Sequence, residues 1–100
     1  MDVFNESTGL LLLAIHFSAD KHRDQRRKNN SKSPYINHPI EVTKMLWEIG
    51  EIRDPITLIS AVLHDTLEDT QTTHAEIRNN FGDEVLSVVL EVTDGELPLG

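Results

Sequence analysis

Apolar residues recur three or four positions apart along most of this chain, which is the spacing typical of amphipathic helices. Ser7 or Thr8 can cap a first helix, and the helical pattern continues from there to about Lys28. The polar residues 29–34, which end in a proline, then predict a loop. Since strand-like alternation is not convincing, the pattern predicts an all-α fold with about five helices.

Capping signals mark the start of the next two predicted helices. His38 and the proline after it open one of them, because a proline in the first turn of a helix loses no hydrogen bond. Asp54 and the proline after it open the other, which is apolar on nearly all sides and should therefore be the central helix. This third helix is expected to continue through the charged residues 64–69.

Similar signals mark the last two predicted helices. Residues 73–76 have the Thr-x-x-Glu pattern of a capping box, and Asp83 caps a final helix whose valines would also suit a strand. The apolar surface of five helices requires a further partner, so residues 93–100 are expected to lead into another element. Residues 1–100 are therefore expected to form one domain that is incomplete at its C-terminus.

Charge is distributed unevenly along the chain. The formal net charge is −8, yet six of the nine basic residues lie within residues 21–32, where Asp24 is the only acidic residue. Because a general nucleic-acid binder presents a broad positive surface, this distribution argues against nucleic acid and suits a small anionic ligand. A solvated helix end and loop is the alternative. The six basic residues are Lys21, Arg23, Arg26, Arg27, Lys28 and Lys32.

The sequence predicts neither a membrane span nor a disulfide. The apolar run 9–15 is too short to cross a bilayer and lacks the basic leader of a signal peptide. The chain has no cysteine, which excludes disulfides, thiolate metal ligands and cysteine nucleophiles. This composition fits a reducing compartment, so a cytoplasmic location is expected.

A sudden change of polarity at the end of the third predicted helix marks candidate chemistry. Along a continuous helix His64 and Glu68 would be neighbours on one face, and so would Asp65 and Asp69. Three carboxylates at the C-terminal end of a buried helix repel one another and oppose the helix dipole, so a bound cation would stabilise them. Solvated helix-end carboxylates and a structural histidine are the alternative.

A second histidine strengthens the metal interpretation. If the second and third helices pack antiparallel through the short loop 51–53, His38 would lie near His64 and Asp65. Two imidazoles and one carboxylate suit a first-row divalent ion such as Mn²⁺ or Fe²⁺, which can activate water for hydrolysis.

The remaining histidines and the tyrosine carry separate expectations. His16 is predicted to be a core or boundary residue, and His22 could face a substrate. No chemistry is assigned to His74, because the first turn of a helix disfavours a cation. Tyr35 is expected to be a packing residue close enough to His38 to support it.

Five motifs occur in order along the chain. They are KHRDQRRK at 21–28, PYINHP at 34–39, LHDTLEDT at 63–70, FG at 81–82 and EVTD at 91–94. In these motifs the chain resembles the hydrolase domain of RelA/SpoT proteins and their stand-alone alarmone hydrolases, within the HD superfamily of metal phosphohydrolases. The resemblance runs from about Leu10 to Leu97. It implies an HD-domain helical bundle, of which this chain is the N-terminal portion.

The resemblance also implies an activity. The family's enzymes are Mn²⁺-dependent 3′-pyrophosphohydrolases that convert guanosine 3′,5′-bis(diphosphate), or ppGpp, and water into GDP and pyrophosphate. The family takes a further aspartate ligand from a downstream helix that lies beyond the residues of this chain. Hydrolysis of another nucleotide phosphate, such as NADPH, and a catalytically inactive nucleotide-binding fragment are the alternatives. By resemblance His38, His64 and Asp65 bind the metal, Glu68 and Asp69 are catalytic, and Arg27 and Lys28 bind the nucleotide.

Overall fold

In the part of the chain that the structure describes, the regular secondary structure is helical, apart from one isolated bridge between Arg26 and Pro34. The computed structural model describes residues 3–27 and 32–93, and five of the helices in these ranges have eight residues or more. The predicted all-α fold is therefore confirmed, and none of these helices has the length and apolar character needed to cross a membrane. The helices are α1 (Val3–Lys21), α2 (Asn37–Glu48), α3 (Pro55–Leu63), α4 (Thr66–Asp69), α5 (His74–Phe81) and α6 (Asp83–Thr93).

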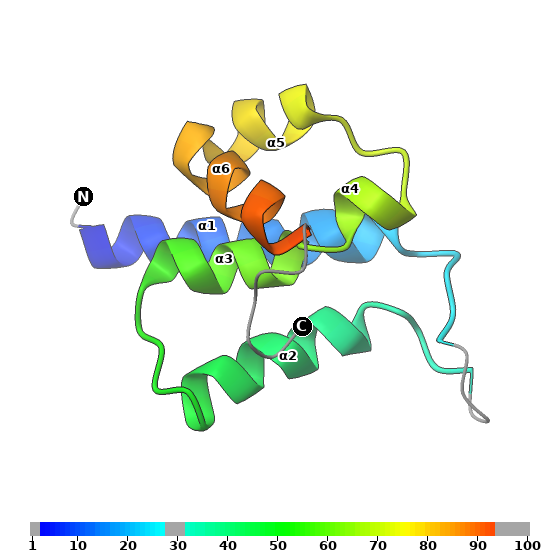
Figure 1. Cartoon of the computed structure of the whole chain (residues 1–100), viewed down its shortest axis with the longest axis horizontal. Coiled ribbons are helices and arrows are strands. Elements are labelled where there is room, and N and C mark those ends of the chain that lie inside the picture. Colours follow the sequence, from blue (N-terminus) through cyan, green and yellow to red (C-terminus); the bar gives the residue numbers. More distant parts are fainter. Residues whose placement is uncertain (1–2, 28–31, 94–100) are drawn as a thin grey trace.

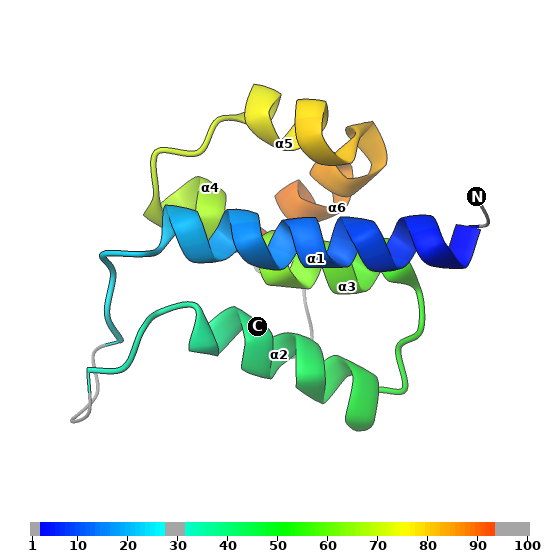
Figure 2. The same ribbon diagram turned by 180° about the vertical axis from the view of Figure 1, so that it is seen from behind.

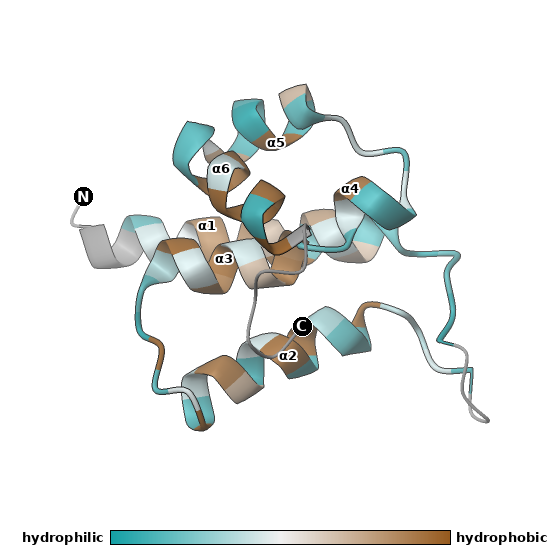
Figure 3. Cartoon of the chain, viewed as in Figure 1, coloured by the Kyte–Doolittle hydropathy of each residue, from teal (hydrophilic) through white to brown (hydrophobic). Residues whose placement is uncertain are grey.

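Helix α3 is the centre of the fold, as its apolar sequence predicted. It contacts α1, α2 and α6, and the two opposite views show α1 beside it with α2 on one side of this pair and α5 and α6 on the other (Figures 1 and 2). Hydrophobic colour follows α3, whereas hydrophilic colour dominates α5 (Figure 3). The main core consists of Ala14, Ile59, Val62, Leu63, Ile77, Phe81, Val85, Leu86 and Val89.

Local signals explain where several helices begin. The Asp54 carboxylate accepts a hydrogen bond from the Thr57 backbone N–H at 3.2 Å and so caps α3. At the start of α5, Thr73 and Glu76 form the predicted capping box, in which each side chain bonds the other residue's backbone N–H. The valine-rich segment is the helix α6 rather than a strand, because its apolar side packs on α3 and α5.

The first helix ends at Lys21, so the predicted end near Lys28 is wrong. After α1 the chain turns, with the Gln25 N–H bonded to the His22 carbonyl at 2.8 Å. Residues 25–27 then run beside residues 33–35: the Tyr35 N–H donates to the Gln25 carbonyl at 3.0 Å, and the Arg27 N–H donates to the Ser33 carbonyl at 2.9 Å. These bonds replace the helical ones, and residues 22–27 form a turn and a loop beside the start of α2.

The third helix also ends earlier than predicted. It stops at Leu63, whose carbonyl accepts a hydrogen bond from the Thr66 hydroxyl at 2.7 Å, and the chain resumes as the short helix α4. Residues 64 and 65 thus form a turn, and residues 66–69 form α4. The predicted continuous helix face that would carry His64 and Glu68 together does not exist.

Candidate metal centre

Three side chains that could ligate a metal converge where α2 begins and α3 ends. His38 lies in the first turn of α2, and His64 and Asp65 occupy the turn between α3 and α4. Because α2 and α3 pack side by side and are joined by a short loop, these two ends come together (Figure 1). One potential ligand atom from each residue lies within 4.8 Å of the other two, and all three residues are half-buried.

The two oxygens of Asp65 face different histidines. Oδ1 lies 3.2 Å from His64 Nε2, and Oδ2 lies 3.7 Å from His38 Nε2. The other ring nitrogen of His64, Nδ1, lies 2.6 Å from the Ala61 carbonyl and must carry a hydrogen to donate there. In a neutral imidazole the Nε2 lone pair then faces a carboxylate oxygen, and a cation between the two relieves this repulsion.

His38 is suited to binding a metal as a neutral imidazole. Burial lowers the pKa of His38 below its ordinary value of 6.5, and Arg27 and His64 add to this effect, while Asp65 opposes it. The net direction is downward, so the ring carries no charge at neutral pH and a nitrogen lone pair is available. Two imidazole nitrogens and a carboxylate oxygen form a donor set that fits a divalent first-row cation.

Tyr35 connects this cluster to α4. Its hydroxyl donates a hydrogen bond to Asp65 Oδ2 at 2.7 Å and lies 3.2 Å from Asp69 Oδ2. Burial raises the pKa of Tyr35, and the hydrogen bond to Asp65 raises it further, so the hydroxyl keeps its proton and remains a donor. Glu68 is exposed on α4 and takes no part in the hydrogen bonds that join Tyr35 to the two aspartates.

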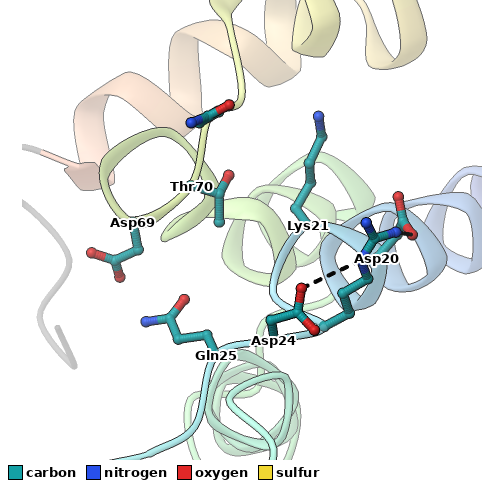
Figure 4. Close-up of a pocket in the computed structure, with 8 residues that line it drawn as sticks. Asp20, Lys21, Asp24, Gln25, Asp69 and Thr70 are labelled. Atoms are coloured by element: carbon teal, nitrogen blue, oxygen red, sulfur yellow. Dashed lines mark hydrogen bonds and ion pairs between the residues drawn. The ribbon is translucent and has the colours of Figure 1, made fainter.

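Two polar cavities lie beside residues 20–27 and Asp69, and the smaller of them includes His38 of the cluster. The smaller has a volume of about 380 Å³ and is lined by Gln25, Arg26, Arg27, Tyr35, His38 and Asp69. The larger, about 610 Å³, shares Gln25 and Asp69 with it, and these two side chains lie across from each other in Figure 4. Among the sequence-predicted nucleotide ligands, Arg27 therefore lines a cavity beside the cluster, whereas Lys28 lies outside the described residues.

The cations of the larger cavity already have anionic partners within the chain. Lys21 Nζ lies 2.7 Å from Glu76 Oε2, which ties the end of α1 to the start of α5. Arg23 lies 3.3 Å from an Asp20 oxygen and 3.7 Å from an Asp24 oxygen. The smaller cavity, which is lined by Arg27 and by His38 of the cluster, is thus the better candidate for an anionic ligand.

Two other histidines differ from their sequence-based expectations. His22 is only 2% exposed and therefore does not face a substrate. Its Nδ1 lies 2.8 Å from Gln25 Oε1, and its ring packs 4.7 Å from the Tyr35 ring, so the turn after α1 encloses it. His16 is exposed rather than buried, because it lies on the outer side of α1.

Comparison with known proteins identifies the family. The model of the HD domain family matches residues 14–96. The chain belongs to the HD domain family. The chain is 49% identical over 90 residues to a Xenopus tropicalis protein named guanosine-3′,5′-bis(diphosphate) 3′-pyrophosphohydrolase MESH1, with 90% of this chain and 50% of the relative covered. The human protein of the same name is 51% identical over 84 residues, which cover 84% of this chain and 47% of that protein.

A solved structure supports the same relationship. The chain superposes with a TM-score of 0.81 and 37% identity on a structure described as a metazoan ortholog of SpoT that hydrolyses ppGpp. The match covers 83% of this chain and 47% of that one. The chain thus spans about half the length of the relatives that it matches.

Proposed function

We propose that this chain carries the metal centre and part of the nucleotide site of a ppGpp 3′-pyrophosphohydrolase. The observation that supports this most is the convergence of His38, His64 and Asp65 beside a cavity lined by Arg27. Relatives that are about 50% identical carry this activity in their names. Residues 1–100 would form the N-terminal part of the hydrolase domain. A cytoplasmic location belongs to the proposal, because a chain without cysteine suits a reducing compartment.

The proposed cofactor is Mn²⁺, held by His38, His64 and Asp65. The donor set supports this choice, because two nitrogens and one carboxylate oxygen suit a divalent ion between hard and soft preferences. A divalent cation at such a site offsets the charge of phosphate oxygens and makes water more acidic. The half-buried Asp65, only 15% exposed, concentrates the negative charge that would attract this ion.

The nucleotide would bind in the smaller cavity, on the side formed by residues 25–27. Its phosphates carry several negative charges, and Arg27 lies close enough to His38 to influence the pKa of that imidazole. Arg27 would place its planar guanidinium against the guanine ring or a phosphate. Lys28, the next residue in the sequence, is the second proposed nucleotide ligand. Binding here would put the 3′-pyrophosphate beside the metal ligands and Asp69, which line or adjoin the same cavity.

Asp69 and Glu68 are the proposed acid–base pair. Hydrolysis forms a bond between the water oxygen and the phosphorus next to the 3′ oxygen, and breaks the bond from that phosphorus to the 3′ oxygen. One carboxylate would accept the proton lost by water, and the other would give a proton to the 3′ oxygen, so that ppGpp and water become GDP and pyrophosphate. Asp69 lies on the cavity wall, where it could serve in either role.

The proposed function is tested by measuring pyrophosphate release from ppGpp with Mn²⁺. We expect release by the wild-type chain, no release by His64→Ala, and unchanged release by the matched control His74→Ala, whose histidine is exposed at the start of α5. A panel that includes NADPH separates ppGpp hydrolysis from hydrolysis of another nucleotide phosphate. Absence of release by the wild-type chain at saturating Mn²⁺ would contradict the proposed turnover.

A second candidate is nucleotide binding without turnover. It is supported by the position of Glu68, which is exposed on α4 and lies outside the hydrogen bonds that join Tyr35 to the two aspartates. Calorimetric titration of ppGpp into the chain, with and without Mn²⁺, distinguishes the two functions. Binding with no pyrophosphate release would favour this second candidate.

A further inference from the structure

One hydroxyl touches both carboxylates that the proposed function uses. Tyr35, the only tyrosine of the chain, lies 30 residues before Asp65 and 34 residues before Asp69 in the sequence. Its Oη lies 2.7 Å from Asp65 Oδ2 and 3.2 Å from Asp69 Oδ2. The loop before α2 is thereby joined to both ends of α4.

The shorter contact fixes the orientation of the Asp65 carboxylate. The final torsion of an aspartate side chain has only broad preferences, so a free carboxylate rotates easily. In this structure Oδ2 accepts the Tyr35 hydrogen, and Oδ1 is left facing His64 Nε2 at 3.2 Å. The hydroxyl thus selects which oxygen is directed at which histidine, which is what a ligand carboxylate needs before an ion arrives.

The tyrosine is itself held in place from two sides. Its backbone N–H donates to the Gln25 carbonyl at 3.0 Å, and its ring packs 4.7 Å from the buried ring of His22. The Gln25 side chain bonds His22 Nδ1 at 2.8 Å, so the same residue fixes both the backbone of Tyr35 and the ring beneath it. Such support is what makes a hydroxyl a rigid donor rather than a mobile one.

We propose that Tyr35 is a positioning residue: its hydroxyl orients Asp65 for metal binding and holds Asp69 next to it. This inference rests on the proposed function, because it assigns Asp65 to the metal and Asp69 to catalysis. Since the hydroxyl has a single hydrogen, given to Asp65, the closer bond determines metal affinity and the contact at 3.2 Å restrains Asp69 more weakly.

The direct test is Tyr35→Phe, which removes one oxygen and keeps the ring that packs on His22. The matched control is Thr43→Val, which removes a hydroxyl from α2 that donates to the Pro39 carbonyl at 2.8 Å. Binding of Mn²⁺ alone to each full chain is measured by electron paramagnetic resonance, which needs no turnover, and circular dichroism verifies the helical content. We expect Tyr35→Phe to raise the Kd for Mn²⁺ by about 10–100-fold, as loss of a partner of a metal ligand typically does. We expect Thr43→Val to leave it unchanged.

The possible results separate this inference from the proposed function. If Tyr35→Phe binds Mn²⁺ with the same Kd as the wild-type chain, the proposed role of Tyr35 is wrong, but the proposed metal centre is unaffected. An equal loss of affinity in Thr43→Val would also overturn it, because a general loosening of α2 would then explain both results. A wild-type chain that binds no Mn²⁺ would contradict the proposed metal centre, and this inference with it.

Discussion

Replacing Leu63 by alanine tests whether the end of α3 is held by core packing. Leu63 is 0% exposed and belongs to the main core, directly before the proposed metal ligand His64. Truncation removes its buried side chain and leaves a cavity, which together cost about 2–5 kcal/mol at comparable sites. Leu12, on α1, is 62% exposed, so Leu12→Ala is a matched control with an expected cost within about 0.5 kcal/mol.

Urea unfolding of the two variants and the wild type measures these costs. With a urea dependence of about 2 kcal/mol per molar, the Leu63→Ala midpoint should fall by roughly 1–2.5 M. The cost itself is a large part of the stability of a small domain. The Leu12→Ala midpoint should barely move. A Leu63→Ala cost below about 1 kcal/mol, or equal costs for the two leucines, would refute the assignment of α3 as the packed centre of the fold.

Three further predictions follow from individual contacts. Thr73→Ala removes one half of the α5 capping box and should cost about 1 kcal/mol of unfolding free energy, measured by urea titration. The hydrogen bond from Lys21 lowers the pKa of Glu76 in the folded state below its ordinary value of 4.5. Glu76→Gln should therefore reduce the free energy of unfolding above pH 4.5. This difference from the wild type should vanish as the pH falls through the lowered pKa. Arg27→Ala should raise the Kd for ppGpp by about 10–100-fold in calorimetry, because a charged hydrogen bond or ion pair is lost.

Each of these predictions has a result that would count against it. An unchanged unfolding midpoint for Thr73→Ala would mean that tertiary packing alone determines where α5 begins. A Glu76→Gln effect that is the same at low and neutral pH would show that the Lys21–Glu76 ion pair does not cause it. Equal ppGpp affinity in Arg27→Ala would place the nucleotide outside the smaller cavity.

The sequence predicted those helix boundaries that depend on local chemistry. Asp54 before a proline and the pair of Thr73 and Glu76 act within one turn, so their capping bonds can be inferred without the tertiary structure. The antiparallel arrangement that brings His38 toward His64 also follows from a short connection between two helices. These signals were sufficient to predict the convergence of the two chain segments.

The sequence-based predictions were wrong where side chains compete with helical hydrogen bonds or where a distant residue makes the contact. The Thr66 hydroxyl bonds the Leu63 carbonyl and the His64 ring bonds the Ala61 carbonyl, and these bonds accompany the break that ends α3. His22 is buried partly by the ring of Tyr35, which lies 13 positions later in the sequence but packs against the His22 ring. No local sequence pattern indicates this contact between the two rings. The position of Tyr35 three residues before His38 indicated only that Tyr35 lies close to the candidate metal ligands.

Crystals grown with Mn²⁺ and measured at the manganese absorption edge test the metal centre most directly. We expect one strong anomalous peak in contact with His38 Nε2, His64 Nε2 and a carboxylate oxygen of Asp65. A strong peak elsewhere, with none at these three residues under excess Mn²⁺, would contradict the assignment of this cluster as the metal centre.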